Sequence, residues 1–418
     1  MALTKREATN AKRETNMTKP RISEATFTES EYVSDVSVSA TASVLMEAER
    51  LRAAGVDIVD MGAGEPDFPT PQHIKEAAYR AIEGNFTRYT STGGIAPLKS
   101  AILELIRRDF NVDYKPAESI VTVGGKQAIF NAMAALLNAG DDVLIPAPYW
   151  VTFPEIARFL RARPVFIDTA STEFVLTADM VRRAITPRTR LLIVNSPNNP
   201  TGRVIPPEEF RKIVEAAAER DVWVISDECY LYFAHPPATP FTAGQLSAEL
   251  RSRVMISGSF SKTFAMTGWR VGYALGPAPW IAGMLKVQSH STSNTSSISQ
   301  KAAIEAATAP PDAVNLMIAE YRRRRDWIVP ALNEIEGIEC AMPEGAFYVF
   351  PNVTGVLGGQ IKTSGEFAKL LLDSARVVVT DGSAFGAEGY LRISYAASLE
   401  ALQEGVERIA LTAKSLRK

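Results

Sequence analysis

The sequence has few of the residues that build metal sites or disulfide frameworks. It holds two cysteines, Cys229 and Cys340, and three histidines, His73, His235 and His290. Two cysteines cannot form a disulfide framework, and neither residue type shows metal-ligand spacing. We therefore expect no metal ion.

Long apolar runs and an excess of one charge are also lacking. No stretch approaches the roughly 18 to 20 apolar residues of a membrane span. The formal net charge of -2 gives no reason to expect a nucleic-acid partner. At 418 residues with 46% hydrophobic residues, the chain is long and apolar enough for two globular domains. The composition predicts a cytoplasmic protein that binds neither membranes nor nucleic acid.

The N-terminal segment differs from the rest of the chain. Its first 30 residues are polar and mixed in charge, without hydrophobic periodicity. They lack the apolar core of a signal peptide, and Glu7, Glu14 and Glu24 argue against an organelle transit peptide. We expect a disordered tail over residues 1–30, with Met1 and Met17 as alternative translation starts.

From about residue 71 onward, short apolar strands alternate with amphipathic helices. The expected strands are residues 120–123, 143–145, 164–167, 191–194, 222–225, 254–256 and 272–275. This alternation predicts an α/β fold with a mostly parallel sheet covered by helices on both faces. A smaller α+β region follows, with strands near residues 346–350, 377–380 and 390–395 and a closing helix over 399–414.

These patterns suggest a division of the chain. We expect residues 31–70 to form an N-terminal arm and part of the small domain, residues 71–308 the large domain, and residues 309–418 the rest of the small domain. The serine-rich stretch 289–297 is predicted to be a linker. The run Arg322 to Arg325 is predicted to be a solvated, ion-paired helix rather than a nucleic-acid patch.

One lysine, Lys262, lies among small and hydroxylated residues in the stretch 259–272. Burial there would lower the pKa of its ammonium group and free the amine for imine chemistry. Ser259, Ser261 and Arg270 are suitable donors for a phosphate nearby. An amine beside a phosphate clamp is the arrangement that pyridoxal 5'-phosphate (PLP) needs.

Further candidates follow predicted strands, where ligands of parallel sheets bind. Asp227 can pair with a pyridine nitrogen, while Tyr230 and Asn199 can bond the ring O3′. Trp150 can stack on the ring, and the strand–Gly125–helix junction offers N–H groups to a phosphate. Taken singly, Asp227 also fits a solvated strand end, Asn199 a structural turn and Trp150 an apolar core.

Two other residues stand out in predicted strands or beside them. Arg392 lies within strand-like residues, where a buried arginine needs an anion, and a substrate carboxylate would satisfy it. Cys229 alternates away from Asp227 and is predicted to be a small core residue.

Seven motifs occur in order: AGEPDF, VTVGGKQ, PYWV, NSPNNPTG, SDECY, SKTFAMTGWRVGY and LRISYA. From about Ser39 to the C-terminus the chain resembles the fold-type I, class I aminotransferases. It is most similar to the bacterial aspartate aminotransferase subgroup that includes aspartate/prephenate aminotransferases. The resemblance implies PLP as cofactor, a PLP fold-type I large domain, and a homodimer with shared active sites.

The resemblance also implies a role for each candidate. Lys262 would bind PLP as an imine and later shuttle the Cα proton, with Asp227, Tyr230, Asn199 and Trp150 around the ring. The phosphate would be held by Ser259, Ser261, Arg270, the amides of Gly125 and Lys126, and Tyr89 of the neighbouring subunit. Arg392 and the Gly64 amide would take the substrate α-carboxylate, bordered by Trp150 and Asn199, and the Lys126 side chain the distal carboxylate of a dicarboxylic substrate.

The implied activity is ping-pong transfer of the amino group from aspartate to 2-oxoglutarate. One departure concerns Ser37, which stands where prephenate-accepting members carry a lysine two residues before Ser39, so prephenate activity is not expected. The alternatives are an aromatic, broad-range or prephenate aminotransferase, or a β-eliminating lyase on the same fold. A PLP-binding transcription regulator would need a DNA-binding region that the short polar tail cannot form.

Overall fold

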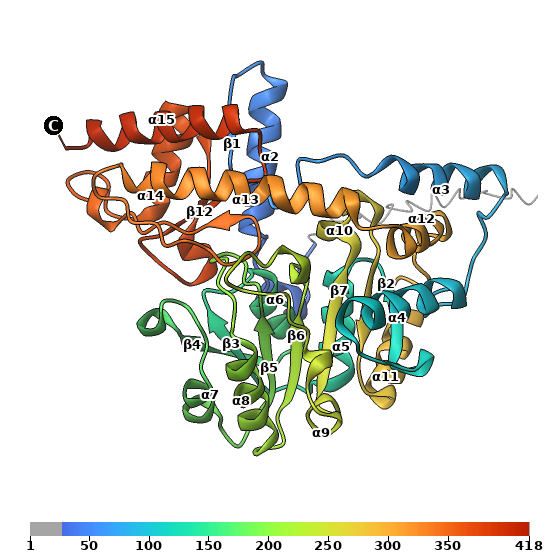
Figure 1. Cartoon of the computed structure of the whole chain (residues 1–418). Helices are drawn as coiled ribbons and strands as arrows, with labels where there is room; N and C mark the ends of the chain where they lie inside the picture. The colour runs from blue at the N-terminus through green and yellow to red at the C-terminus, as the bar shows by residue number, and fades with distance from the viewer. Residues whose placement is uncertain (1–26, 418) are drawn as a thin grey trace, which may run out of the picture.

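The computed structural model describes residues 27–417 (Figure 1). The predicted disordered tail, apart from its last four residues (27–30), lies outside the described residues, as do Met1 and Met17.

A seven-stranded sheet forms the centre of the larger part, in the strand order β2-β8-β7-β6-β5-β3-β4 (Figure 1). Its strands are β2 (Ser119–Thr122), β3 (Asp142–Ala147), β4 (Arg163–Asp168), β5 (Thr189–Asn195), β6 (Trp223–Asp227), β7 (Val254–Ser259) and β8 (Gly272–Leu275). Only β8 is antiparallel to its neighbours, β2 and β7. The predicted mostly parallel sheet is confirmed.

Alternate residues of the strands, except in β4, belong to two separate cores, because successive strand side chains point to opposite faces. In β5, Leu192 and Val194 join one core, and Leu191 and Ile193 join the other. The first core is covered by α3 (Gln72–Glu83), α4 (Ala96–Phe110), α7 (Ala178–Ala184), α8 (Pro207–Ala218) and α12 (Ser297–Thr308). The second is covered by α5 (Gly125–Leu136), α6 (Thr152–Phe159) and α11 (Ala278–Ser289).

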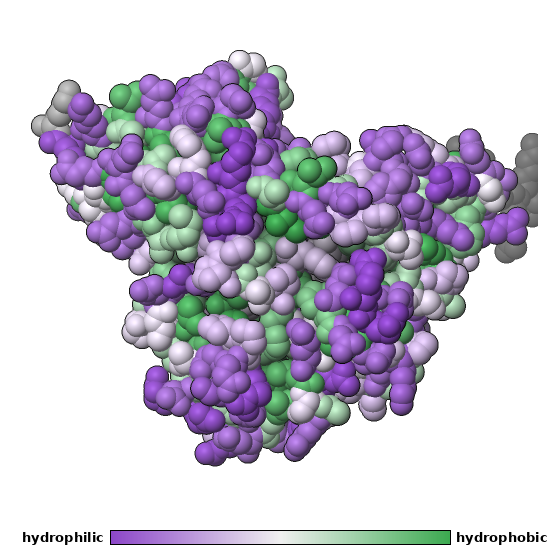
Figure 2. Space-filling model, in the orientation of Figure 1, coloured by the Kyte–Doolittle hydropathy of each residue, from purple (hydrophilic) through white to green (hydrophobic). Residues whose placement is uncertain are grey.

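The smaller part lies above one end of this sheet in Figure 1. It contains a three-stranded antiparallel sheet of β11 (Thr380–Asp381), β12 (Leu391–Ser394) and β9 (Tyr348–Val349), and a parallel pair of β1 (Val59–Asp60) with β10 (Val377–Val378). Its helices are α2 (Ala40–Ala53), α13 (Asp312–Asn333), α14 (Ser364–Leu370) and α15 (Leu399–Ser415). The β1–β10 pair joins the N-terminal segment to this part. Hydrophilic residues cover most of the face in Figure 2, because the apolar side chains pack inside the layers.

One prediction about the connecting region is wrong. The serine-rich stretch joins α11 to α12, and α12 packs against α3 and α4, so it does not link the two parts. The arginine run forms the predicted ion-paired helix, with partners Glu320, Asp326 and Asp67, but it is not uniformly solvated: Arg324 and Arg325 are 6% and 5% exposed. Helix α13 lies between the two parts, so the residues on its inner side are covered.

Among the described residues, no helix combines the length and apolar character needed to cross a membrane. The same residues contain no cluster of three histidine, cysteine or carboxylate side chains that could hold a metal ion.

Candidate active site

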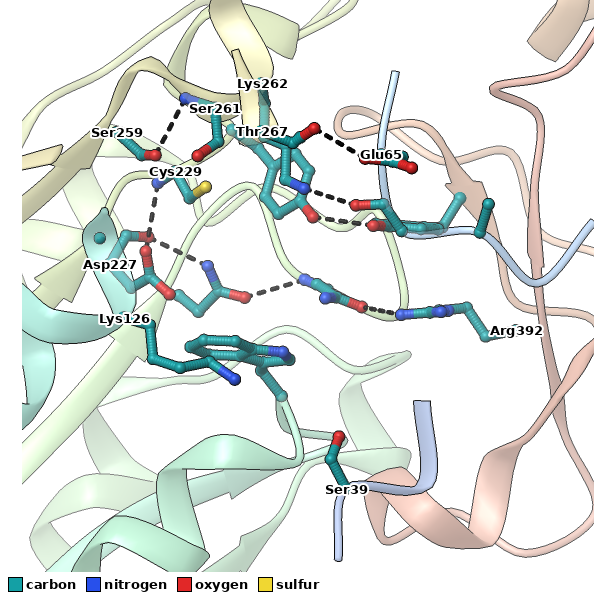
Figure 3. A pocket seen from close by; sticks show the side chains of 18 of the residues that line it. Ser39, Glu65, Lys126, Asp227, Cys229, Ser259, Ser261, Lys262, Thr267 and Arg392 are labelled. Atoms are coloured by element: carbon teal, nitrogen blue, oxygen red, sulfur yellow. Dashed lines mark hydrogen bonds between the residues drawn. The ribbon is translucent and has the colours of Figure 1, made fainter. Parts of the chain in front are cut away.

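A cavity of about 400 Å³ lies at the carboxyl ends of β5, β6 and β7, facing β12 across the gap (Figure 3). Its lining includes every predicted site residue except Tyr89. These residues are Gly64, Gly125, Lys126, Trp150, Asn199, Asp227, Tyr230, Ser259, Ser261, Lys262, Arg270 and Arg392. Segments up to about 330 residues apart in the sequence therefore meet at one place.

Lys262 lies in the short helix α10 (Phe260–Thr263), which directly follows β7. Its Nζ donates a hydrogen bond to the Gly64 carbonyl at 2.5 Å. Burial lowers the pKa of the Lys262 ammonium, and Cys229 and Glu65 oppose this only in part. A neutral amine is therefore more accessible here than for a lysine in water, which suits both a nucleophile and a proton carrier.

Glycines shape the wall beside Lys262. A Cβ at Gly124 would lie 2.6 Å from Arg270 Nη2, and one at Gly272 would lie 2.4 Å from the Gly124 carbonyl carbon. Only glycine allows this approach, which brings the Arg270 guanidinium against the N-terminus of α5. Ser259 Oγ meanwhile accepts the Ser261 N–H at 3.1 Å, capping α10. A guanidinium, hydroxyls and free helix N–H groups together suit a phosphate.

Asp227 ends β6 on the far side of the cavity from Arg392 (Figure 3). Burial raises the pKa of its carboxyl to about 7, against the opposing effects of the Cys229 N–H and of Lys262. The Cys229 N–H donates to Asp227 Oδ1 at 3.2 Å, and no described residue forms an ion pair with this carboxylate. A protonated ring nitrogen beside it would supply the missing positive charge.

A hydrogen-bonded chain joins Asp227 to Arg392. Asn195 Nδ2 donates to the Asp227 carbonyl at 3.0 Å, and Asn195 Oδ1 accepts the Asn199 N–H at 2.8 Å. Arg392 Nη1 then donates to Asn199 Oδ1 at 3.2 Å. The sequence motif contained Asn195, but its role depends on the β5–β6 register, which places Asn195 opposite Asp227.

Arg392 lies in β12, 2% exposed, between two aromatic rings. Its guanidinium carbon is 4.6 Å from the Tyr348 ring centroid and 5.0 Å from that of Phe385. Nη2 donates to the Gly62 carbonyl at 2.9 Å, whereas Nε is buried without a partner. No described carboxylate pairs with Arg392, so the site suits an incoming anion.

Tyr348 is a cavity residue that the sequence analysis missed. Its hydroxyl lies 2.8 Å from the Tyr230 hydroxyl, and its ring stacks under Arg392. Tyr348 lies in the apolar motif GAFYVF, which contains no pattern of polar residues that would mark it as a site residue.

The core prediction for Cys229 is correct in part. Cys229 is half-buried and packs against the core of the smaller part, but it also lines the cavity, because β6 ends at Asp227 and strand alternation stops there. Burial raises the pKa of the Cys229 thiol to about 12, which keeps it protonated.

A second carboxyl, Glu228, is buried behind the cavity wall. Its Oε1 accepts bonds from Ser226 Oγ and the Ala243 N–H, both at 2.8 Å, while Oε2 has no partner. Burial raises the pKa of Glu228 to about 7. The unfolded chain, with a pKa of about 4.3, ionises first, so the folded state loses stability as pH rises between these values.

We expect Glu228→Gln to remove this pH dependence. Relative to the unsubstituted protein, the variant should become more stable as pH rises from about 5 to about 8. The difference between the two melting temperatures should grow over this range by the equivalent of up to about 3 kcal/mol. Calorimetry of both PLP-loaded proteins across this range checks it. A difference that stays constant with pH would contradict the assignment.

The charged groups of the cavity fit PLP and an amino-acid substrate. Arg270, Lys126 and Arg392 have no acidic partner among the described residues, and Asp227 has no cationic one. Lys126 Nζ lies 5.0 Å from the Trp150 ring centroid. Burial, and then Arg270, lower the pKa of Lys126. The groups match a phosphate, two carboxylates and a pyridinium.

Tyr89 is the one predicted residue that the chain does not bring to its own cavity. Its side chain is 93% exposed. Ser37 is also exposed and lies outside the lining, with its N–H donating to Glu155 Oε2 at 2.8 Å, whereas Ser39 lines the cavity.

Comparison with known proteins agrees with this chemistry. The family aminotransferase class I and II matches residues 56–409. An aspartate aminotransferase from Geobacillus stearothermophilus is 42% identical, over 90% of this chain and 96% of that protein. A probable aspartate/prephenate aminotransferase from Aquifex aeolicus is 43% identical, with the same coverage of 90% and 96%.

Solved structures agree as well. The aspartate aminotransferase from Thermus thermophilus, determined with maleate, superposes with a TM-score of 0.88 at 41% identity and covers 93% of this chain and 100% of that chain. The chain belongs to the class I and II aminotransferases, enzymes that depend on PLP.

Proposed function

We propose that this enzyme transfers the amino group of aspartate to 2-oxoglutarate, giving oxaloacetate and glutamate by a ping-pong cycle. The observation that carries the proposal is the pair of cations Lys126 and Arg392, both facing the cavity and both without an acidic partner among the described residues. A dicarboxylic amino acid offers one carboxylate to each, and pairing compensates the desolvated charges.

The two cations differ in the specificity they provide. Arg392 offers a flat fork held between two rings, which suits the α-carboxylate that all amino acids share. The Lys126 ammonium is a point charge on a flexible stem and suits the distal carboxylate. Aspartate and glutamate carry both groups, whereas phenylalanine carries only the first.

PLP, when bound, supplies the electron sink that makes the Cα proton of an amino acid labile. The chain's own residues do the rest. Ser259, Ser261, Arg270 and the amides of Gly125 and Lys126 would hold the phosphate. Asp227 would pair with the ring nitrogen, Trp150 would pack against the ring, and Tyr230 and Asn199 would bond O3′. Lys262 is the base that takes the Cα proton, because its lowered pKa favours the neutral amine.

The named relatives support the substrate class. Those from Geobacillus and Thermus are called aspartate aminotransferases, and the Thermus enzyme was determined with maleate, a dicarboxylate. The Aquifex relative is a probable aspartate/prephenate enzyme. Ser37 supplies no cation to the cavity, which supports aspartate over prephenate.

We further propose a homodimer in which Tyr89 of one subunit reaches the phosphate of the other. A tyrosine that is 93% exposed in the single chain has its whole ring available to a partner. Tyr79 and Ile82 in α3 are also at least half exposed, at 60% and 50%. Sedimentation of the holoenzyme, together with Tyr89→Phe, tests this arrangement.

The decisive experiment compares amino acids in a single half-reaction. We expect Lys126→Met to lower kcat/KM for aspartate by about 30-fold or more, because truncating one partner of a close charge pair costs at least about 2 kcal/mol. Phenylalanine should change by less than about threefold. Stopped-flow loss of the near-visible absorbance of bound PLP measures both rates.

Lys301→Met is the matched control. Lys301 also lies over an aromatic ring, 4.6 Å from the Phe86 centroid, but outside the cavity. Faster reaction of the unsubstituted enzyme with phenylalanine or cystathionine than with aspartate would favour the aromatic aminotransferase or the β-lyase. Efficient amination of prephenate would contradict the inference from Ser37 that prephenate is not a substrate.

A further inference from the structure

The loop of residues 62–70 borders the cavity and carries Gly64 and Glu65. It has no helix or strand, and within the described part of the chain its residues form no backbone–backbone hydrogen bond. Its position must therefore come from side-chain contacts and from contacts to its carbonyl groups.

On its cavity side the loop contacts two groups with proposed roles in catalysis. The Gly62 carbonyl accepts from Arg392 Nη2 at 2.9 Å, and the Gly64 carbonyl accepts from Lys262 Nζ at 2.5 Å. A Cβ built on Gly64 would lie 3.4 Å from the Tyr348 hydroxyl and 4.0 Å from Arg392 Nη2. Because the contacts are so close, a small shift of the loop changes the geometry at both Arg392 and Lys262.

On its other side the loop is held by one ion pair to α13. Arg324 Nη1 lies 2.9 Å from both carboxylate oxygens of Asp67, and Tyr321 donates to Asp67 Oδ1 at 3.1 Å. The side chains of Arg324 and Asp67 are 7% and 28% exposed. The rings of Phe68 and Tyr321 each lie 5.5 Å from the guanidinium carbon.

A second carboxylate restrains the orientation of the Arg324 side chain. Arg324 Nε also bonds Glu320 Oε1 at 2.8 Å, one turn back along α13, which fixes the plane of the guanidinium. A buried arginine that lost Asp67 would keep an incompletely compensated charge, so the contact resists separation. Helix α13 therefore fixes the distance between itself and the loop.

We propose that Arg324 and Asp67 are positioning residues of the α-carboxylate site, holding Gly62 and Gly64 in register with Arg392 and Lys262. The proposal rests on the proposed function, which places the α-carboxylate at Arg392, and on the family resemblance, which adds the Gly64 amide. Neither Arg324 nor Asp67 lines the cavity.

The test uses PLP-loaded Arg324→Met, Asp67→Asn and the double variant. The matched control is Arg323→Met, because Arg323 is the preceding residue of the same helix, and its side chain is 56% exposed and paired with Glu320 alone among the described residues. For each protein, kcat/KM is measured in the half-reaction with L-aspartate and with L-alanine, together with the melting temperature and the near-visible absorbance. Both amino acids share the α-carboxylate, but only aspartate has a distal one.

We expect Arg324→Met to lower kcat/KM by the same factor for both amino acids, about 10- to 100-fold, since misplacement by about 1 Å has effects of this size. The absorbance of bound PLP and the Arg323→Met rates should stay within about twofold. The double variant should regain most of the melting temperature, because no uncompensated charge is left, yet keep the lowered kcat/KM.

Two results would overturn the proposal: a double variant with unsubstituted kcat/KM, or an equal loss in Arg323→Met. If Arg324→Met gives no soluble holoenzyme, the same measurements are made on Arg324→Lys. A lysine ammonium cannot bond Asp67 and Glu320 in the way that the arginine guanidinium does. Unchanged kcat/KM in that variant overturns the proposal. If the unsubstituted enzyme does not prefer aspartate to alanine, this contradicts the proposed function but not the proposal about the loop. The loop is tested by whether Arg324→Met lowers kcat/KM by the same factor for both amino acids, which does not depend on that preference.

Discussion

Replacing Lys262 by alanine is expected to lower kcat for amino-group transfer by at least about 10⁴-fold, the upper range for loss of a positioned acid–base group. Among the described cavity residues, Lys262 alone has its amine within hydrogen-bond reach of the Gly64 carbonyl. The alanine variant lacks this amine. Both the link to the cofactor and the proton transfer therefore disappear together.

The matched control is Lys126→Ala, which removes the other lysine of the cavity. It should keep the near-visible absorbance of bound PLP, whereas Lys262→Ala should lose it while still retaining PLP through the phosphate contacts. Absorbance spectra, PLP content and turnover separate the two variants. Substantial turnover in Lys262→Ala would refute the assignment of the catalytic lysine.

The second large effect is expected at Arg392. Substitution by lysine keeps the charge but removes the fork that bonds Gly62, Thr380 and Asn199 at once. We expect kcat/KM to fall by about 10²- to 10³-fold, the equivalent of about 3 to 4 kcal/mol for a broken buried charge contact. Aspartate and phenylalanine should lose the same factor, in contrast to Lys126→Met.

Arg325→Lys controls for the general cost of replacing a buried arginine. Arg325 is 5% exposed and bonds the Pro343 carbonyl and Asp326, away from the cavity lining. Its variant should melt at a lower temperature but transaminate normally at 25 °C. A loss at Arg392 confined to aspartate would instead place the distal carboxylate there.

The sheet and most of the cavity were predictable because their signals are local. Each large-sheet strand begins within two residues of its predicted start. Parallel strands end on one edge, so polar residues after predicted strands, such as Asp227 and Asn199, could be expected to meet.

Other features depend on contacts that no local pattern reports. Four successive arginines point in different directions around a helix, and only the position of α13 between the two parts decides that Arg324 and Arg325 are buried. Tyr348 lies in an apolar motif, and its hydroxyl matters only because β9 pairs with β12 beside Arg392. Tyr89 does not line its own chain's cavity, so the role proposed for it depends on a second subunit.

Arg392 and Lys126, two of the basic residues that line the cavity, belong to separate layers. Arg392 belongs to the three-stranded sheet, whereas Lys126 is the second residue of a helix that packs on the seven-stranded one. A dicarboxylate bound to both would connect the two layers, so the spacing between the layers would favour a substrate of matching length. Substitutions far from the cavity that change this spacing would then change the preference between a shorter and a longer dicarboxylate.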